Sequence, residues 1–148
     1  MERELSTIVE TIWATVVGMG LQPADPLASL DEGSLTGCIC FTGGWEATML
    51  VGLPEPLARA AAAAMFGCAE QELSAAEVGD AVGEIANIAA GNLRAFKALP
   101  CETSLPSLVD ASSYAALAAR ACRVARVGFR CGQESLIVEV FESEAAAP

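Results

Sequence analysis

Apolar and polar positions follow two different periods along the chain, and together they predict a protein built from helices and strands. Apolar residues recur at helical spacing over residues 4–18, which predicts an amphipathic helix. Alternating positions predict two pairs of strands, each joined by a short glycine-containing hairpin. The expected strands are residues 35–41, 45–53, 121–131 and 134–142.

Two further helices are predicted between these strand pairs. The first opens at Pro54 and runs to about Phe66, and Gly67 then stands where a C-terminal glycine cap belongs. The second covers residues 75–98, because the preceding Ser74-Ala75-Ala76-Glu77 has the pattern of a capping box.

The order of these elements predicts an α+β fold with a largely antiparallel sheet and helices over at least one of its faces. Residues 101–110 are expected to add one extended segment, and residues 21–34 to form a connection. Residues 143–148 are expected to be a frayed tail.

Length and composition indicate one globular domain. The chain has 148 residues, of which 53% are hydrophobic, and this is enough to bury a core. No linker or internal repeat divides it. We therefore expect a single domain over residues 1–148, with its core in about residues 4–142.

The chain carries a formal net charge of −11. Such a protein repels a phosphate backbone and anionic lipid headgroups, so binding to nucleic acid or to a membrane is not expected. The first residues lack the basic and apolar segments of a secretory signal, and arginines interrupt the alanine-rich runs. A cytoplasmic location is therefore expected.

Histidine is absent from the sequence, whereas six cysteines are present. Without histidine the chain cannot use Ser-His-Asp or Cys-His nucleophilic catalysis. No CxxC pair occurs, and in a reducing compartment we expect the cysteines to be small buried hydrophobic residues. Nucleotide-binding glycine motifs are also absent. We therefore expect this chain to bind no metal and no cofactor.

Residues 75–98 separate into two opposite faces on a helical wheel. The face expected to be buried consists of Val78, Val82, Ile85, Ala89, Leu93 and Phe96. The opposite face consists of Asp80, Glu84, Asn87, Gly91 and Arg94. Asn92 is either an ordinary surface residue or the cap of a helix that breaks at Gly91.

Two features of the polar face are unusual for a solvated helix surface. Asp80 and Glu84 are like charges four residues apart, which is mildly unfavourable in a helix. Gly83 and Gly91 stand inside the helix, where each glycine costs about 1 kcal/mol relative to alanine. On an exposed face a glycine leaves a notch, and the notch lets another backbone approach closely.

Glu84 and Asn87 are three residues apart, so their side chains project side by side. The carboxylate can hold a cationic side chain of a partner, and the amide can hydrogen-bond both a water and an oxyanion. Such groups suit phosphoryl transfer, in which positioning and charge stabilisation supply most of the catalysis. The alternative is that both residues belong to the solvated side of an amphipathic helix.

The stretch GDAVGEIANIAAGN, residues 79–92, resembles the signature helix of the CheC/CheX/FliY family of response-regulator phosphatases. That signature is a glutamate followed three residues later by an asparagine, usually trailed by a Gly-Asn pair. It is matched here by Glu84, Asn87, Gly91 and Asn92. The order of helices and strands also resembles the family over most of the chain, although only this helix is specific.

The signature occurs once in the chain. A second copy might be sought from Glu10, but Trp13 stands where asparagine would be needed. The chain therefore resembles the CheX-like members, which tend to carry one such helix. This resemblance implies a CheC/CheX-like fold with two long central helices, and a homodimer built by sheet pairing.

The resemblance also implies a protein phosphatase, a hydrolase that acts on the aspartyl phosphate of a CheY-like receiver domain in chemotaxis or related two-component signalling. Asn87 would orient the attacking water, and Glu84 would pair with the receiver's lysine. Mg²⁺ would be held by the receiver. The residues that would contact the partner are Asp80, Gly83, Gly91, Asn92 and Arg94. The alternative is a non-catalytic module of the same fold that binds a receiver or a flagellar switch.

Overall fold

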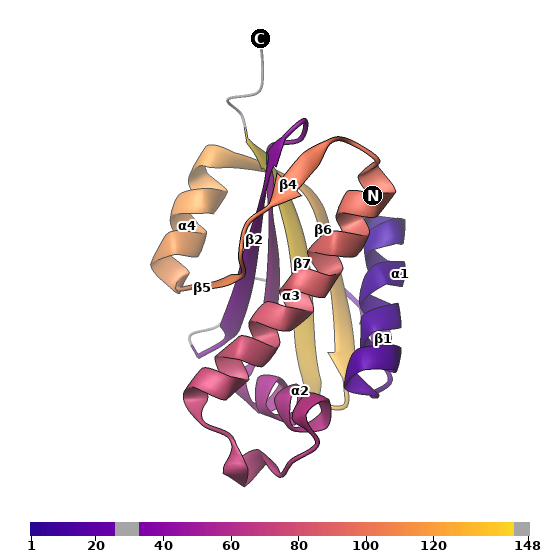
Figure 1. The fold of residues 1–148 in the computed structure, drawn as a ribbon, viewed down its shortest axis with the longest axis vertical. Helices are drawn as coiled ribbons and strands as arrows, with labels where there is room; N and C mark the ends of the chain where they lie inside the picture. Colours follow the sequence, from indigo (N-terminus) through magenta and orange to yellow (C-terminus); the bar gives the residue numbers. More distant parts are fainter. Residues whose placement is uncertain (26–32, 144–148) are drawn as a thin grey trace.

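A computed structural model of the protein describes residues 1–25 and 33–143. The expected tail from residue 144 onward and part of the expected connection, residues 26–32, lie outside the described residues. The described residues form four α-helices and an antiparallel sheet of seven strands (Figure 1). This arrangement confirms the α+β class predicted from the order of the elements.

The sheet has the strand order β1-β6-β7-β3-β2-β4, and β5 also pairs with β2. Its long strands are the two predicted hairpin pairs, which meet where β3 pairs with β7. The strands are β1 (Gln22–Ala24), β2 (Leu35–Gly43), β3 (Ala47–Leu53), β4 (Cys101–Thr103), β5 (Ser107–Val109), β6 (Ala121–Cys131) and β7 (Glu134–Ser143).

Helices lie on both faces of this sheet. The helices are α1 (Glu2–Ile12), α2 (Glu55–Phe66), α3 (Ala75–Lys97) and α4 (Ala111–Arg120), with a π-helical turn over Trp13–Val17 after α1 and a 3₁₀ turn over Glu70–Glu72. Residues of α1, α2 and α3 form one large core with one face of the sheet. A smaller cluster joins Leu50 and Phe141, on the other face, to Tyr114 and Leu117 of α4.

Helix α3 is the longest element, with 23 residues, and it crosses the sheet diagonally (Figure 1). Its predicted capping box is present: the Glu77 N–H donates to Ser74 Oγ at 3.1 Å, and the Ser74 N–H donates to Glu77 Oε1 at 3.0 Å. The hydrogen bond from the Ser74 backbone lowers the pKa of Glu77. The helix ends at Ala98, which has a positive φ of 53°.

Four sequence predictions need correction. The segment over residues 101–110 is two short strands, β4 and β5, which pair with different parts of β2. Helix α4 was not predicted, because its alanine-rich sequence lacks a clear apolar period, although Asp110 caps it by accepting the Ser113 N–H at 2.8 Å. Strand β1 lies within residues 21–34, which were expected to form a connection. It was not predicted, because Pro23 argued against a strand there. Phe96 is 48% exposed, because α3 extends past the edge of its core.

The six cysteines are free thiols, and they are not uniformly buried as the sequence analysis expected. Cys38 and Cys101 are buried, whereas Cys40 and Cys122 are exposed. Burial raises the pKa of the Cys38 thiol to about 11, and the neighbouring Cys40 adds to the rise. Cys40 lies two residues beyond Cys38 on the same face of β2, and Cys122 lies at the second position of β6.

Candidate functional site

The predicted polar face of α3 is exposed along its length. Asp80, Glu84, Asn87, Gly91 and Arg94 are all exposed. The opposite face of the helix is buried, with Val82, Ala86, Ala90 and Leu93 fully excluded from solvent. The packing of α3 on the sheet therefore presents one polar stripe to solvent.

Glu84 and Asn87 lie side by side on this stripe. Within the described part of the chain, neither side chain makes a hydrogen bond or an ion pair. Three residues of α-helix separate them by about 4.5 Å along the helix axis, so both can enter one small site on a partner. Their polar groups are therefore available to bind another molecule.

The two glycines predicted as notches differ in the structure. Gly91 is exposed, and a Cβ added to it would meet no atom within 4 Å. Gly83 is buried, and a Cβ there would lie 3.3 Å from Cβ of Pro106. The prediction of an open notch is therefore wrong for Gly83: its backbone is approached by the chain's own β4–β5 segment.

Asn92 is an exposed residue of a continuous helix. Its Nδ2 donates to the carbonyl oxygen of Ile88 at 2.9 Å, and α3 continues to Lys97. The alternative in which Asn92 caps a helix that breaks at Gly91 is therefore wrong. The side chain is held against its own helix and lies beside the open position at Gly91.

Two hollows flank the ends of the polar stripe. A groove of about 380 Å³ lies beside Asp80 and Glu84 and is walled on its far side by Pro106, Ser107 and Leu108. A second hollow of about 400 Å³ lies beside Arg94, with Pro100 and Glu102 among its lining residues. The acidic and basic ends of the stripe therefore open onto separate depressions.

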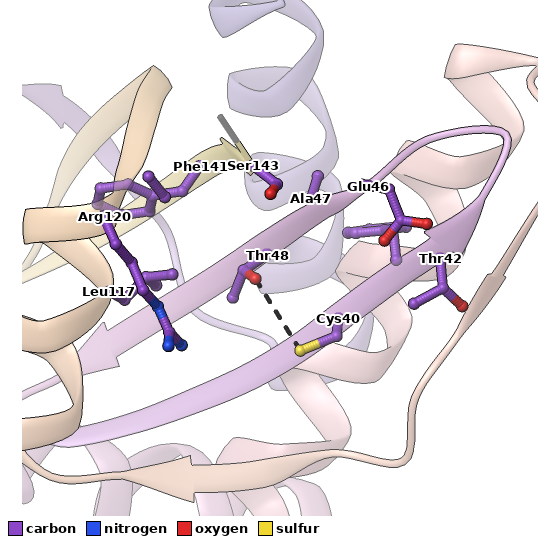
Figure 2. A pocket seen from close by; sticks show the side chains of 11 residues that line it. Cys40, Thr42, Glu46, Ala47, Thr48, Leu117, Arg120, Phe141 and Ser143 are labelled. Carbon is purple, nitrogen blue, oxygen red and sulfur yellow. Dashed lines mark hydrogen bonds between the residues drawn. The ribbon is translucent and has the colours of Figure 1, made fainter. Parts of the chain in front are cut away.

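A larger pocket of about 470 Å³ lies on the α4 side of the sheet (Figure 2). Arg120 reaches from α4 toward Cys40, whose Sγ lies 3.9 Å from Oγ1 of Thr48. Glu46 also lines the pocket, but its Oε1 already accepts the Gly43 N–H at 3.1 Å. None of the candidate residues predicted from sequence lies in this pocket.

The chain shows no metal centre in residues 1–25 and 33–143, where no group of three or more His, Cys, Asp or Glu side chains could hold an ion. Across the same residues, no helix is long and apolar enough to cross a membrane. The α3 stripe itself carries the carboxylates of Asp80 and Glu84, the carboxamide of Asn87 and the guanidinium of Arg94.

The wall opposite Asp80 and Glu84 was not predicted from the sequence. Pro106 and Leu108 lie against α3 at Gly83 and Gly79, where added Cβ atoms would approach within 3.3 and 3.0 Å. Two glycines four residues apart are a signal for close approach of another chain segment. That signal was present, but it could not identify the segment as part of the same chain.

Comparison with known proteins supports the resemblance at the level of family and fold. The family model described as "Chemotaxis phosphatase CheX" matches residues 35–130. The chemotaxis protein CheX from Vibrio vulnificus is 20% identical, with a TM-score of 0.73, and the match covers 94% of this chain and 93% of that one. No curated protein matches the sequence significantly.

Two other solved structures extend this comparison. A chain of the CheX–CheY–BeF3–Mg²⁺ complex from Borrelia burgdorferi is 13% identical, with a TM-score of 0.72 and coverage of 96% of this chain and 97% of that one. FliY from Thermotoga maritima is 14% identical, with a TM-score of 0.57 and coverage of 95% and 85%. At these identities the likeness concerns the fold.

We predict that alanine stabilises the protein more at Gly91 than at Gly83. Gly91→Ala should raise the free energy of unfolding by up to about 1 kcal/mol, because alanine is the better helix residue and its methyl group meets nothing. Gly83→Ala should gain less or lose stability, because its methyl group presses on Pro106. Urea unfolding of both variants measures the difference. A stabilised Gly83→Ala and a destabilised Gly91→Ala would contradict the described packing.

Proposed function

Because this chain belongs to the chemotaxis phosphatase CheX family, we propose that it hydrolyses the aspartyl phosphate of a response-regulator receiver domain. The observation that carries the proposal is the exposed Glu84–Asn87 pair, which has no partner among the described residues. A polar pair with no role in its own fold is available to complete the site of another protein.

The proposed reaction needs no nucleophile on this chain. A water oxygen attacks the phosphorus, the bond between phosphorus and the receiver's aspartate oxygen breaks, and the aspartate leaves as a carboxylate. Inorganic phosphate and solvent take the proton that the water loses. Asn87 accepts a hydrogen bond from this water and so holds it in line with the bond that breaks, a positioning role that suffices for phosphoryl transfer.

Glu84 has a separate role in the proposal. Its carboxylate pairs with the lysine beside the receiver's phosphorylated aspartate and so fixes the helix over the receiver's site. Mg²⁺, when bound by the receiver, neutralises charge on the phosphoryl oxygens. This chain holds the water and the lysine and shields both from bulk solvent.

The related CheX from Borrelia burgdorferi was solved as a complex with CheY, BeF3 and Mg²⁺. We propose a CheY-like receiver as partner for this chain on that precedent and on the shared fold. Gly91 supports the proposal, because an exposed glycine one turn beyond Asn87 lets the receiver's backbone approach α3.

Other expectations remain predictions. The homodimer and the cytoplasmic location follow from the resemblance and from the sequence, and so does the absence of a resident cofactor. A docking module without catalysis would use the same face of α3, and the response to Asn87 substitution separates it from a phosphatase.

We predict that Asn87→Ala abolishes most of the catalysis. Removal of one transition-state positioning group typically costs about two to three orders of magnitude in rate. A CheY-type receiver is phosphorylated with a small-molecule donor in Mg²⁺, the donor is removed, and decay of the phosphoprotein is followed with each protein. Gln133→Ala, which removes an exposed carboxamide in the β6–β7 turn, is the control and should keep wild-type acceleration.

A wild-type rate with Asn87→Ala would contradict the assigned role of this residue. Measurable binding of the wild-type protein to the receiver without any acceleration of decay would favour the docking module over the phosphatase.

Glu84→Ala is predicted to weaken docking as well as turnover. The Kd for the receiver should rise at least about thirtyfold, because removing one partner of a desolvated ion pair costs about 2 kcal/mol or more. Calorimetric titration of the receiver loaded with beryllofluoride and Mg²⁺ measures this constant. Glu10→Ala, at an exposed carboxylate of α1, serves as the control. An unchanged Kd for Glu84→Ala would contradict the proposed contact between Glu84 and the receiver's lysine.

A further inference from the structure

The groove beside Asp80 and Glu84 has two chemically different walls. Helix α3 contributes both carboxylates, whereas the β4–β5 segment contributes Pro106 and Leu108. Among the described residues, no lysine or arginine lines the groove. Of the described residues, none forms an ion pair with Asp80 or Glu84. The acidic wall therefore lacks a counter-cation, and a partner can supply one.

The β4–β5 segment is a fixed wall of this groove. Ser104 makes two hydrogen bonds with the backbone of β2, of 2.8 and 2.9 Å. Pro106 lies over Gly83, and Leu108 lies against Gly79. The segment is therefore tied to the sheet on one side and to α3 on the other.

This wall presents two large apolar side chains to solvent. Leu105 is 89% exposed and Leu108 is 47% exposed. Single exposed leucines are common on protein surfaces and need no explanation. Here, however, both leucines belong to the segment that walls the groove. Leu108 lines the groove opposite Glu84, and Leu105 directly precedes Pro106 of the same wall. An apolar edge next to a polar site is typical of a protein interaction surface.

We propose that Leu105, Pro106 and Leu108, here called the docking ridge, act with Asp80 to select which receiver binds. This inference rests on the proposed function. Its occupant is the receiver surface around the phosphorylated aspartate, with an apolar side chain against the ridge and a second cation against Asp80. Charge complementarity carries this choice, because two uncompensated carboxylates attract a cationic surface and repel an acidic one.

Helix geometry places Asp80 and Glu84 against different parts of the receiver in this proposal. Asp80 precedes Glu84 by one turn, or about 6 Å along the axis. When Glu84 meets the lysine inside the receiver's site, Asp80 and the ridge meet the receiver's surface outside that site. Receivers share the phosphorylation chemistry but differ in surface side chains, so the ridge sets affinity while Glu84 and Asn87 act on the phosphoryl group.

The experiment measures the decay rate of trace phosphorylated receiver against increasing concentrations of this protein. Each curve gives a half-saturating concentration and a maximal rate. Leu105→Ser should raise the half-saturating concentration about tenfold, the cost of losing most of one buried leucine contact. Its maximal rate should stay unchanged. Asp80→Asn should also raise the half-saturating concentration. Leu105→Met keeps a large apolar side chain and should have a half-saturating concentration close to that of the wild-type protein.

Val124→Ser is the matched control. Val124 is 37% exposed on β6, and two strands, β7 and β3, separate β6 from β2. This variant should match the wild-type protein in both parameters. A wild-type half-saturating concentration in Leu105→Ser overturns the inference, and so does a loss of maximal rate at unchanged half-saturation.

A wild-type protein that does not accelerate decay would refute the proposed function instead. The ridge is then tested by the Kd of the same variants for the receiver loaded with beryllofluoride and Mg²⁺. Weaker binding of Leu105→Ser than of Val124→Ser supports the ridge. Equal binding, or no binding by the wild-type protein, overturns it.

Discussion

The close packing of α3 on the sheet is the constraint on which the rest of the structure depends. At Gly37 of β2 an added Cβ would lie 3.0 Å from Cβ of Ala86 and 3.1 Å from the carbonyl oxygen of Val82. Only a glycine lets strand and helix approach this closely. The alanines on the inner face of α3 fill the remaining space, so the helix lies flat and its rotation about its own axis is fixed.

This fixed rotation determines what α3 can do. Its inner face is committed to the core, and the β4–β5 segment covers Gly79 and Gly83 on one flank. What remains is a narrow outer stripe that carries Glu84, Asn87 and Gly91. A rigid helix presents such groups with little motion, which favours precise insertion into a partner. Stability and the proposed function therefore use different faces of one helix.

Sequence reasoning located this helix because three independent signals agreed: the capping box at Ser74, the apolar period and the family pattern. It failed where tertiary context decides. Gly83 was predicted to be an open notch, because a helical wheel describes one helix by itself. It cannot show that Pro106 of another segment lies against this glycine. Phe96 was assigned to the core because a period does not reveal where the sheet ends. Helix α4 was not predicted, because its many alanines do not divide into clear apolar and polar faces on a helical wheel.

The most direct test of the account is a crystal structure of the full chain bound to a CheY-type receiver loaded with beryllofluoride and Mg²⁺. The account predicts that Asn87 reaches the beryllofluoride group on the side opposite the aspartate, and that the Glu84 carboxylate lies within about 4 Å of the receiver's lysine nitrogen. A receiver seated on the α4 side of the sheet, or on α3 with both side chains outside its site, would contradict the account.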